Sequence, residues 1–277
     1  MHLPLSVALS PDIEILDACG STNTELVARA AEAELPDLSV LVTGNQTAGR
    51  GRLGRVWVAP PGQTLAISVL LRPRLPAGEP LGLEHYGWLP LIAGVAMTRA
   101  LSPLVPDHRV RLKWPNDVQI DGSKVSGLLA ELLPSGDAVV MGAGANLTIG
   151  SADLPTATST SLLLNGAVLN GALLNGAVLD GDELADVVLS GYLTELTSLV
   201  SEFLRFGADS VASGIAELVD ELCSTLGQEV RVELPGGDVL RGTAVGIDGT
   251  GRLRVQSSAD GRITAVAAGD VTHLRYE

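Results

Sequence analysis

Residues 113–124 of this 277-residue chain are Lys113-Trp114-Pro115-Asn116-Asp117-Val118-Gln119-Ile120-Asp121-Gly122-Ser123-Lys124. A strand is predicted over Val110–Lys113, and the Trp-Pro-Asn-Asp sequence after it predicts a rigid turn. The Asp-Gly pair then predicts a hairpin that joins a strand over Val118–Ile120 to one over Lys124–Leu133. Short strands joined by tight turns favour a mixed sheet over the strict strand–helix alternation of a parallel one.

The other elements are predicted from apolar patterning and turn residues. Strands are expected over Ile13–Leu16, Ser39–Thr43, Leu65–Leu70 and Ala138–Ala143, and helices over about Thr24–Glu34, Tyr86–Ala100, Asp182–Phe206 and Asp209–Leu226. The last fifty residues change to short strands with tight turns, over Glu229–Leu234, Val239–Ile247, Leu253–Gln256 and Ile263–Val266. Such spacing predicts a small β-barrel. The prediction is an α+β chain, with a mixed sheet and helices over residues 1–226 and a barrel over residues 227–277.

Composition limits the class of protein. Hydrophobic residues make up 46% of the chain, and the formal net charge is −14. Residues 1–150 hold 14 acidic and 11 basic side chains and residues 151–277 hold 18 and 7, so the acidic second half would repel DNA. No apolar run reaches the roughly 18 to 20 residues that span a bilayer, and the two cysteines and four histidines lack disulfide or metal-ligand spacing. We expect a cytoplasmic protein that binds neither DNA nor membrane.

Lysine occurs only as Lys113 and Lys124, and the other basic residues are arginine. An ammonium is a compact, mobile point charge, whereas a guanidinium is a planar fork. Asn116 and Asp117 follow a strand, at a position where polar groups converge on a sheet-edge site. Asp117 is expected to hold Lys113 or an arginine of the loop described next, and Lys124 to reach the same cleft. A well-capped turn with two incidental lysines is the alternative.

Residues 46–57 form the glycine-arginine loop, Gln46-Thr47-Ala48-Gly49-Arg50-Gly51-Arg52-Leu53-Gly54-Arg55-Val56-Trp57. Three guanidiniums within six residues repel one another unless an anion lies among them, and the glycines let backbone N–H groups turn toward that anion. Phosphate is the natural candidate. The loop lacks the Gly-Lys-Ser/Thr of a Walker phosphate loop and is not a dinucleotide fingerprint. A solvated basic turn or an RNA-binding Arg-Gly motif remains an alternative.

Together, four motifs closely resemble those of the biotin protein ligases, the bacterial biotin–[acetyl-CoA-carboxylase] ligases. In the family's order they are Ser21-Thr22-Asn23, the glycine-arginine loop, Lys113-Trp-Pro-Asn-Asp117 with Lys124 beyond it, and Gly142-Ala-Gly-Ala-Asn146. The resemblance implies a core like that of class II aminoacyl-tRNA synthetases and a C-terminal SH3-like barrel. It implies that biotin and ATP form biotinyl-5′-AMP, and that a specific lysine of the biotin carboxyl carrier protein of acetyl-CoA carboxylase then takes the biotinyl group.

The resemblance also implies which residues form the site. The expected catalytic residues are Lys124, at the junction of the biotin carboxylate and the triphosphate, and Arg52. Biotin is expected to contact Ser21, Thr22, Asn23, Gln46, Arg50, Gly51, Arg52 and Lys124. ATP and the adenylate are expected to contact Arg50, Arg52, Arg55, Trp57, Lys113, Asn116, Asp117 and Asn146, with Trp57 stacking over adenine or closing the loop on it. Mg²⁺ is expected near Asn146.

Two departures and two alternatives accompany the resemblance. Many bacterial relatives begin with a winged helix-turn-helix, whereas here the catalytic domain is expected to begin within the first dozen residues. The expectation is a ligase without DNA binding, as a monomer or weak homodimer. The sequence Asn-Gly-Ala-Val/Leu-Leu occurs three times from Asn165 to Leu179 and departs from the family pattern, as an inserted loop or irregular helix of unknown role. Lipoate or octanoate ligases and transferases of the same fold are the alternative function, and a non-enzymatic adaptor is a more remote one.

Overall fold

The larger sheet has seven strands in the order β1-β2-β5-β9-β8-β7-β6. The computed structural model describes residues 1–10, 12–57, 59–169, 172–173, 181–234, 238–267 and 270–273. The strands are β1 (Ile13–Leu16), β2 (Val40–Thr43), β5 (Thr64–Leu71), β6 (Val110–Lys113), β7 (Asp117–Ile120), β8 (Ser123–Leu132) and β9 (Val139–Asn146). β1 and β2 are parallel and the other neighbours antiparallel, which confirms the predicted mixed sheet.

The hairpin between β7 and β8 has the predicted turn. Asp121 and Gly122 both have positive φ, 48° and 90°, as a two-residue turn between right-twisted strands requires. β7 pairs with β8 from Ser123 to Gly127, and β8 continues beyond it to Leu132 against β9. The second half of β8 therefore extends beyond the end of the shorter strand β7. This step at the edge of β7 forms one wall of a pocket described below.

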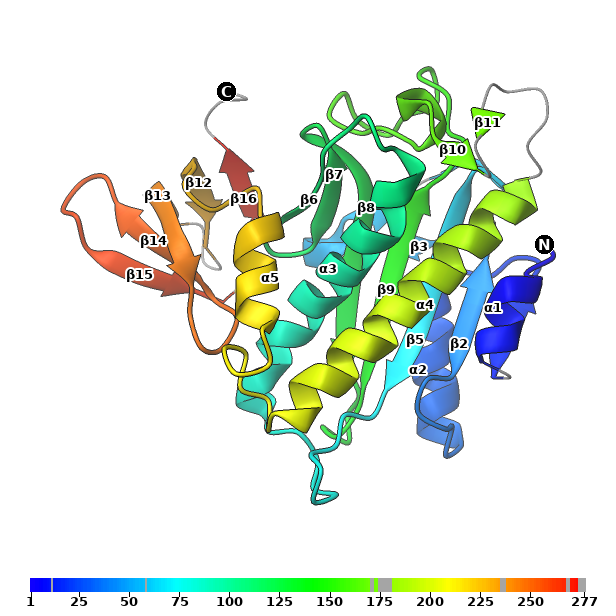
Figure 1. The fold of residues 1–277 in the computed structure, drawn as a ribbon, viewed down its shortest axis with the longest axis horizontal. Coiled ribbons are helices and arrows are strands. Elements are labelled where there is room, and N and C mark those ends of the chain that lie inside the picture. Colours follow the sequence, from blue (N-terminus) through cyan, green and yellow to red (C-terminus); the bar gives the residue numbers. More distant parts are fainter. Residues whose placement is uncertain are drawn as a thin grey trace.

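The two faces of the sheet carry different helices, because successive strand residues point to opposite faces. α2 (Thr22–Glu32) packs through Leu26 on one face, against Leu41, Leu70 and Val140. On the opposite face the sheet packs under α3 (Leu89–Leu101) and α4 (Gly181–Arg205), through residues that include Val42, Val69 and Met141. Figure 1 shows α3 and α4 in front of the sheet and α2 behind it. The motif residues of β8 and β9 that matter below lie on the α2 face.

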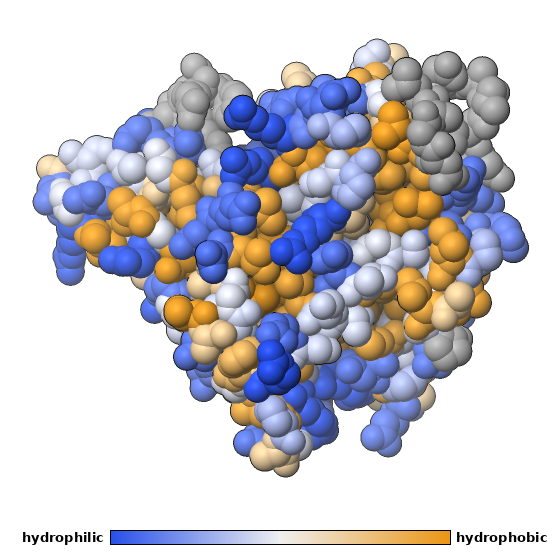
Figure 2. Space-filling view, in the orientation of Figure 1, coloured by the Kyte–Doolittle hydropathy of each residue, from blue (hydrophilic) through white to orange (hydrophobic). Residues whose placement is uncertain are grey.

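The described helices include one, α4, with the length and composition of a membrane-crossing helix. Its apolar residues enter the core of the fold: Leu184, Val188, Leu189, Tyr192 and Phe203 are all buried. α4 lies along α3 and also contacts α1 (Pro4–Leu9). Figure 2 shows apolar surface mixed with polar side chains over this helical layer. A core helix accounts for the composition.

The C-terminal sheet has five antiparallel strands in the order β15-β14-β13-β12-β16. They are β12 (Glu229–Glu233), β13 (Val239–Ile247), β14 (Leu253–Ser257), β15 (Ile263–Val266) and β16 (Asp270–His273), and β16 is not among the predicted strands. Trp88 Nε1 donates to Gly249 O at 2.9 Å, and Trp114 Nε1 donates to Gly251 O at 3.2 Å. Two buried indoles thus join the C-terminal sheet to the larger domain. The domain boundary at residue 226 stays a prediction.

Two helical predictions need correction. The helix predicted from Asp209 begins only at α5 (Ile215–Leu222), since the Asp209 carboxylate accepts backbone N–H bonds from Val211 and Ala212 and holds a turn. The predicted helix over Tyr86–Ala100 divides into a 3₁₀ segment, η2 (Leu83–Trp88), and α3. A further 3₁₀ turn, η3 (Ser102–Leu104), follows α3.

Three segments contain structure where the sequence predicts none or leaves it open. α1 was not predicted. The glycine-arginine loop contains a hairpin of β3 (Gly49–Arg50) and β4 (Val56–Trp57) around η1 (Arg52–Gly54). In the repeat, η4 (Leu163–Asn165) precedes a second hairpin, β10 (Val168–Leu169) with β11 (Ala172–Leu173). Residues 170–171 and 174–180 of the repeat region lie outside the described residues.

Candidate active site

The first turn of α2 forms one wall of a small polar pocket on the α2 face. Ser21, Thr22 and Asn23 are all buried, and the Ser21 hydroxyl accepts from Thr24 N at 3.4 Å as the helix cap. The Gln46 amide oxygen accepts from Thr22 N at 2.8 Å, so the root of the glycine-arginine loop is tied to the helix. Four predicted biotin-contacting residues are therefore gathered at one place.

A buried hydroxyl that the sequence analysis missed joins these groups. Ser68 Oγ lies 2.8 Å from Thr22 Oγ1 and 2.6 Å from Asn23 Oδ1. The Asn23 amide nitrogen in turn donates to Leu129 O at 3.0 Å and to the Glu131 carboxylate at 3.1 Å. The orientation of Asn23 is thus set from both ends. The available signal was one serine within the apolar strand Thr64–Leu71.

Glycines form the floor of the small pocket. Gly127 of β8 and Gly144 of β9 are directly opposed across the sheet, and Leu129 opposes Gly142 in the same way. A Cβ at Gly142 would lie 2.3 Å from Asn23 Oδ1, and one at Gly144 would lie 2.7 Å from the Trp57 indole. The alternate residues Ala143 and Ala145 enter the core on the other face. The Gly-Ala-Gly-Ala sequence therefore gives a bare surface on one side of the strand and packing on the other.

The arginines of the glycine-arginine loop have partners within the site. Arg50 Nη1 lies 3.1 Å from the Glu131 carboxylate, and Arg52 Nη1 donates to Asn116 Oδ1 at 3.0 Å. Glu131, another residue that the sequence analysis missed, thus binds both Arg50 and Asn23. The Arg55 side chain is exposed, and its backbone oxygen accepts from Gly51 N at 2.8 Å. Arg52 is thus tied to the Trp-Pro-Asn-Asp turn, whereas Arg50 is paired with Glu131 but keeps a side chain that is 53% exposed.

Lys124 lies against the glycine floor. Its Nζ is 2.6 Å from Asp117 Oδ1 and 5.7 Å from the centroid of the Trp57 ring. Asp117 was expected to hold Lys113 or a loop arginine, and the ion pair that forms is with Lys124. The Lys124 backbone is bonded on both sides, since Lys124 N donates to Thr158 O at 2.7 Å and Thr160 N donates to Lys124 O at 2.8 Å. The segment after β9 thus returns to the site.

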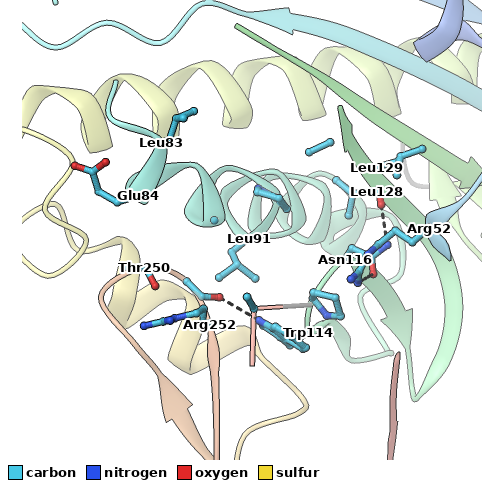
Figure 3. Close-up of a pocket in the computed structure, with 16 residues that line it drawn as sticks. Arg52, Leu83, Glu84, Leu91, Trp114, Asn116, Leu128, Leu129, Thr250 and Arg252 are labelled. Carbon is cyan, nitrogen blue, oxygen red and sulfur yellow. Dashed lines mark hydrogen bonds between the residues drawn. The ribbon is translucent and has the colours of Figure 1, made fainter. Parts of the chain in front are cut away.

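A second, larger pocket of about 500 Å³ lies at the step between β7 and β8. Asn116 links the turn before β7 to β8, because its Nδ2 donates to Leu128 O at 2.7 Å. Figure 3 shows Arg52 and Asn116 together at one end of the pocket, and Thr250 and Arg252 of the C-terminal domain at the other. Leu91, Trp114 and Leu128 supply apolar walls. The pocket thus combines apolar surface with guanidiniums from two parts of the chain.

Eight of the fourteen predicted site residues line one of these two pockets. Ser21, Thr22, Asn23, Gln46, Arg50 and Trp57 line the small pocket, whereas Arg52 and Asn116 line the larger one. Trp57 therefore lies at the small pocket, and its predicted contact with adenine stays a prediction. The other six predicted residues line neither pocket: Gly51, Arg55, Lys113, Asp117, Lys124 and Asn146. The pKa of the nearby Cys19 thiol is raised by burial and by the Glu25 carboxylate.

The described residues contain no cluster of three or more His, Cys, Asp or Glu side chains that would hold a metal ion. Asn146, the predicted Mg²⁺ ligand, is buried at the end of β9 on the α2 face, and its Nδ2 donates to Thr160 O at 2.9 Å. Mg²⁺ in proteins is usually bound through carboxylates together with substrate phosphates. The contact between Asn146 and Mg²⁺ stays a prediction.

Comparison with known proteins identifies the fold and its relatives. Residues 17–146 match the biotin/lipoate A/B protein ligase family, and residues 225–274 match the biotin protein ligase C-terminal domain. The chain is 37% identical over 266 residues to the biotin–[acetyl-CoA-carboxylase] ligase of Mycobacterium tuberculosis. The aligned region covers 95% of this chain and 89% of that protein. It is 36% identical to the bifunctional ligase/repressor BirA of Escherichia coli over 50% of this chain and 41% of that protein.

Solved structures agree with these relatives. The biotin protein ligase of Aquifex aeolicus in complex with biotin and ATP has a TM-score of 0.67 at 26% identity, over 94% of this chain and 97% of that one. The ligase of Leishmania major in complex with biotinyl-5-AMP has a TM-score of 0.58 at 26% identity, over 93% and 99%. The order of the motifs, the two-part fold and the extent of these matches lead to one conclusion: the chain belongs to the biotin protein ligase family.

Proposed function

We propose that this protein is an ATP-dependent biotin protein ligase. It forms biotinyl-5′-AMP and transfers biotin to one lysine of the biotin carboxyl carrier protein of acetyl-CoA carboxylase. The observation that supports this most directly is the position of Lys124. Its ammonium lies against Gly127 on the floor of the small pocket, and its partner Asp117 follows Asn116, which lines the larger pocket.

The small pocket is suited to the ureido ring of biotin. That ring has one acceptor oxygen and two N–H donors, so it requires neutral donors and acceptors at fixed positions. Thr22, Asn23 and Gln46 supply hydroxyl and amide groups whose orientations are already set by Ser68 and by one another. Preset partners reduce the ordering cost on binding.

The cations around the pockets are suited to the first chemical step. Attack of a carboxylate on the α-phosphate brings two anions into contact, and fixed positive charge offsets their repulsion. Lys124 is placed to bind the carboxylate, after it exchanges Asp117 for the substrate. Arg50 and Arg52 are placed on the loop that borders both pockets, and we assign them to the phosphates and the adenylate. Positioning of this kind accounts for much of the rate gain in phosphoryl and nucleotidyl transfer.

Mg²⁺ is assigned to the substrate and not to a resident site. ATP carries Mg²⁺ on its phosphates, and Asn146 is the one protein ligand that we propose for it. The metal would neutralise phosphate charge there. The role of Asn146 is testable separately from catalysis, because an Asn146→Asp change should tighten Mg²⁺ binding to the enzyme–nucleotide complex.

The partner follows from the same assignment. The acceptor is the carrier domain of a biotin-dependent carboxylase, and we place the reaction in the cytoplasm. A net charge of −14 disfavours DNA as a further partner. The oligomeric state, monomer or weak homodimer, stays a prediction.

The experiment that tests this function is pyrophosphate release from MgATP with biotin, lipoate or octanoate as the acid. We expect release with biotin, trapped as biotinyl-5′-AMP, and at most a trace with the other two acids. Lipoate- or octanoate-dependent release that exceeds the biotin rate would assign the chain to the lipoate branch. Absence of both adenylate formation and biotin binding would favour the non-enzymatic adaptor, because biotin binding at micromolar or lower concentration excludes a pure adaptor.

A further inference from the structure

Trp57 occupies the position in which a ligand of the small pocket would lie. Its indole lies directly on the opposed glycines, since a Cβ at Gly144 would be 2.7 Å from Trp57 Cε2 and a Cβ at Gly127 would be 3.3 Å from Trp57 Cζ3. Both are glycines, so the sheet surface has no side chain of its own at either position. The bare floor is thus covered by an aromatic ring from the glycine-arginine loop.

The space that remains is too small for a substrate. The pocket among Thr22, Asn23, Gln46 and Trp57 has a volume of about 30 Å³. Small-molecule sites ordinarily have about 300–1,000 Å³. The polar groups that we assign to the ureido ring are in place, but the volume for the rest of the molecule is filled.

The inserted ring has the features of a displaceable occupant. Trp57 Nε1 is buried with no hydrogen-bond partner among the described residues. A buried donor without a partner destabilises the arrangement that contains it. The Lys124 ammonium, which is bonded to Asp117 at 2.6 Å, lies 5.7 Å from the centroid of the ring. The strand that bears it, β4, is only two residues long.

We propose that Trp57 is a plug: in the ligand-free protein its indole stands in for biotin on the Gly127–Gly144 floor, and biotin enters only when the indole withdraws. This rests on the proposed function, since it names biotin as the ligand. Withdrawal of the ring frees the floor, and Lys124 then exchanges Asp117 for the incoming carboxylate. Trp57 therefore determines the rate of biotin association, separately from any contact it makes with bound substrate.

The proposal has a kinetic consequence. If the open form is a minor fraction of the population, the observed association rate and affinity are both reduced by that fraction. Removal of the ring should therefore raise the association rate constant, even if the loss of a contact with bound biotin also raises the dissociation rate constant. A residue that only packs over bound biotin would change dissociation alone.

The test measures association of radiolabelled biotin by rapid filtration, which does not use tryptophan as the reporter. The variants are Trp57→Ala and Trp57→Phe, with Val56→Ala as the matched control. Val56 is the other residue of β4, and its side chain is 69% exposed. We expect the association rate constant to rise at least about tenfold in Trp57→Ala, by less in Trp57→Phe, and to stay at the wild-type value in Val56→Ala. An unchanged or lower rate constant in a folded Trp57→Ala protein would overturn the plug.

A second measurement needs no biotin and so separates the plug from the proposed function. The emission of Trp57 is obtained as wild type minus Trp57→Phe, because Trp88 and Trp114 are buried and remain in both proteins. In the ligand-free protein this component should be blue-shifted and protected from acrylamide. A red-shifted, fully quenched component would overturn the proposal whether or not biotin binds. If the wild type fails to bind biotin, the proposed function fails and the emission result alone decides the plug.

Discussion

Lys124→Ala is the change from which the structure predicts the largest loss of activity with the smallest loss of stability. The Lys124 side chain is 33% exposed and that of Asp117 is 24% exposed. Partly exposed ion pairs of this kind contribute about 0–1 kcal/mol to folding. The variant should therefore unfold within a few degrees of the wild type.

The catalytic loss is larger because two anions meet at this position. A unit charge at about 4 Å from one anion contributes roughly 4 kcal/mol at an effective dielectric constant of about 20. At about 1.4 kcal/mol for each factor of ten, the loss of kcat/KM for biotinyl-AMP formation should be on the order of 10³-fold. Pyrophosphate release under biotin-limited conditions measures this ratio.

Two further variants separate charge from contact. Lys124→Gln keeps most of the side-chain length and should lose nearly as much activity as Lys124→Ala, since neither carries the charge. Asp117→Asn leaves the ammonium in place and should lose much less. A Lys124→Ala enzyme that retains kcat/KM within tenfold of the wild type would refute the assignment of Lys124 to the junction of the two anions.

Three predictions concern the rest of the fold. The buried carboxylate of Asp186 accepts two backbone N–H hydrogen bonds from α1, each 2.8 Å long. Asp186→Ala should therefore lower the free energy of unfolding, measured in urea, by about 2–4 kcal/mol. A decrease of less than about 0.5 kcal/mol would contradict this reasoning. Tyr192 is fully buried, and its hydroxyl has no hydrogen-bond partner among the described residues. Tyr192→Phe should therefore leave the unfolding free energy unchanged or raise it by about 1 kcal/mol. A decrease of more than about 1 kcal/mol would contradict an unpartnered hydroxyl. The hydrogen bond from His108 lowers the pKa of the Asp121 carboxyl in the folded protein. This interaction stabilises the fold at pH values above the unfolded-state pKa of Asp121, and the stabilisation is lost as the pH falls through the lower folded-state pKa. In His108→Ala, NMR titration should find this pKa nearer to 3.8, and no upward shift would refute the cause.

Much of the fold could be predicted because its signals are local. Ile13–Leu16 and Val110–Lys113 have the predicted bounds, and Asp121-Gly122 forms the predicted turn, since alternation and turn chemistry are properties of neighbouring residues. α1 could not be found in this way. Its first N–H groups are bonded to Asp186, about 180 residues away, and that contact is absent from any local window.

The site residues likewise divide into those that sequence motifs identify and those that act through partners distant in sequence. The motifs identify Thr22, Gln46 and Asn116, which bear the polar groups of the pockets. Ser68 and Glu131 act through residues distant in sequence, and a lone serine or glutamate in a strand carries no mark of such a partner. The position of Trp57 on the glycine floor depends on how the glycine-arginine loop folds back onto β8 and β9. Its residue type suggested stacking, but not on which surface.

Biotin transfer to the carrier protein tests the central claim most directly. The purified protein is incubated with MgATP, biotin and the apo carrier domain of acetyl-CoA carboxylase, and the carrier is analysed by mass spectrometry and peptide mapping. The account predicts one biotinyl group on a single carrier lysine, dependent on ATP and lost in Lys124→Ala. An unmodified carrier under conditions in which a known biotin protein ligase modifies it completely would contradict the account.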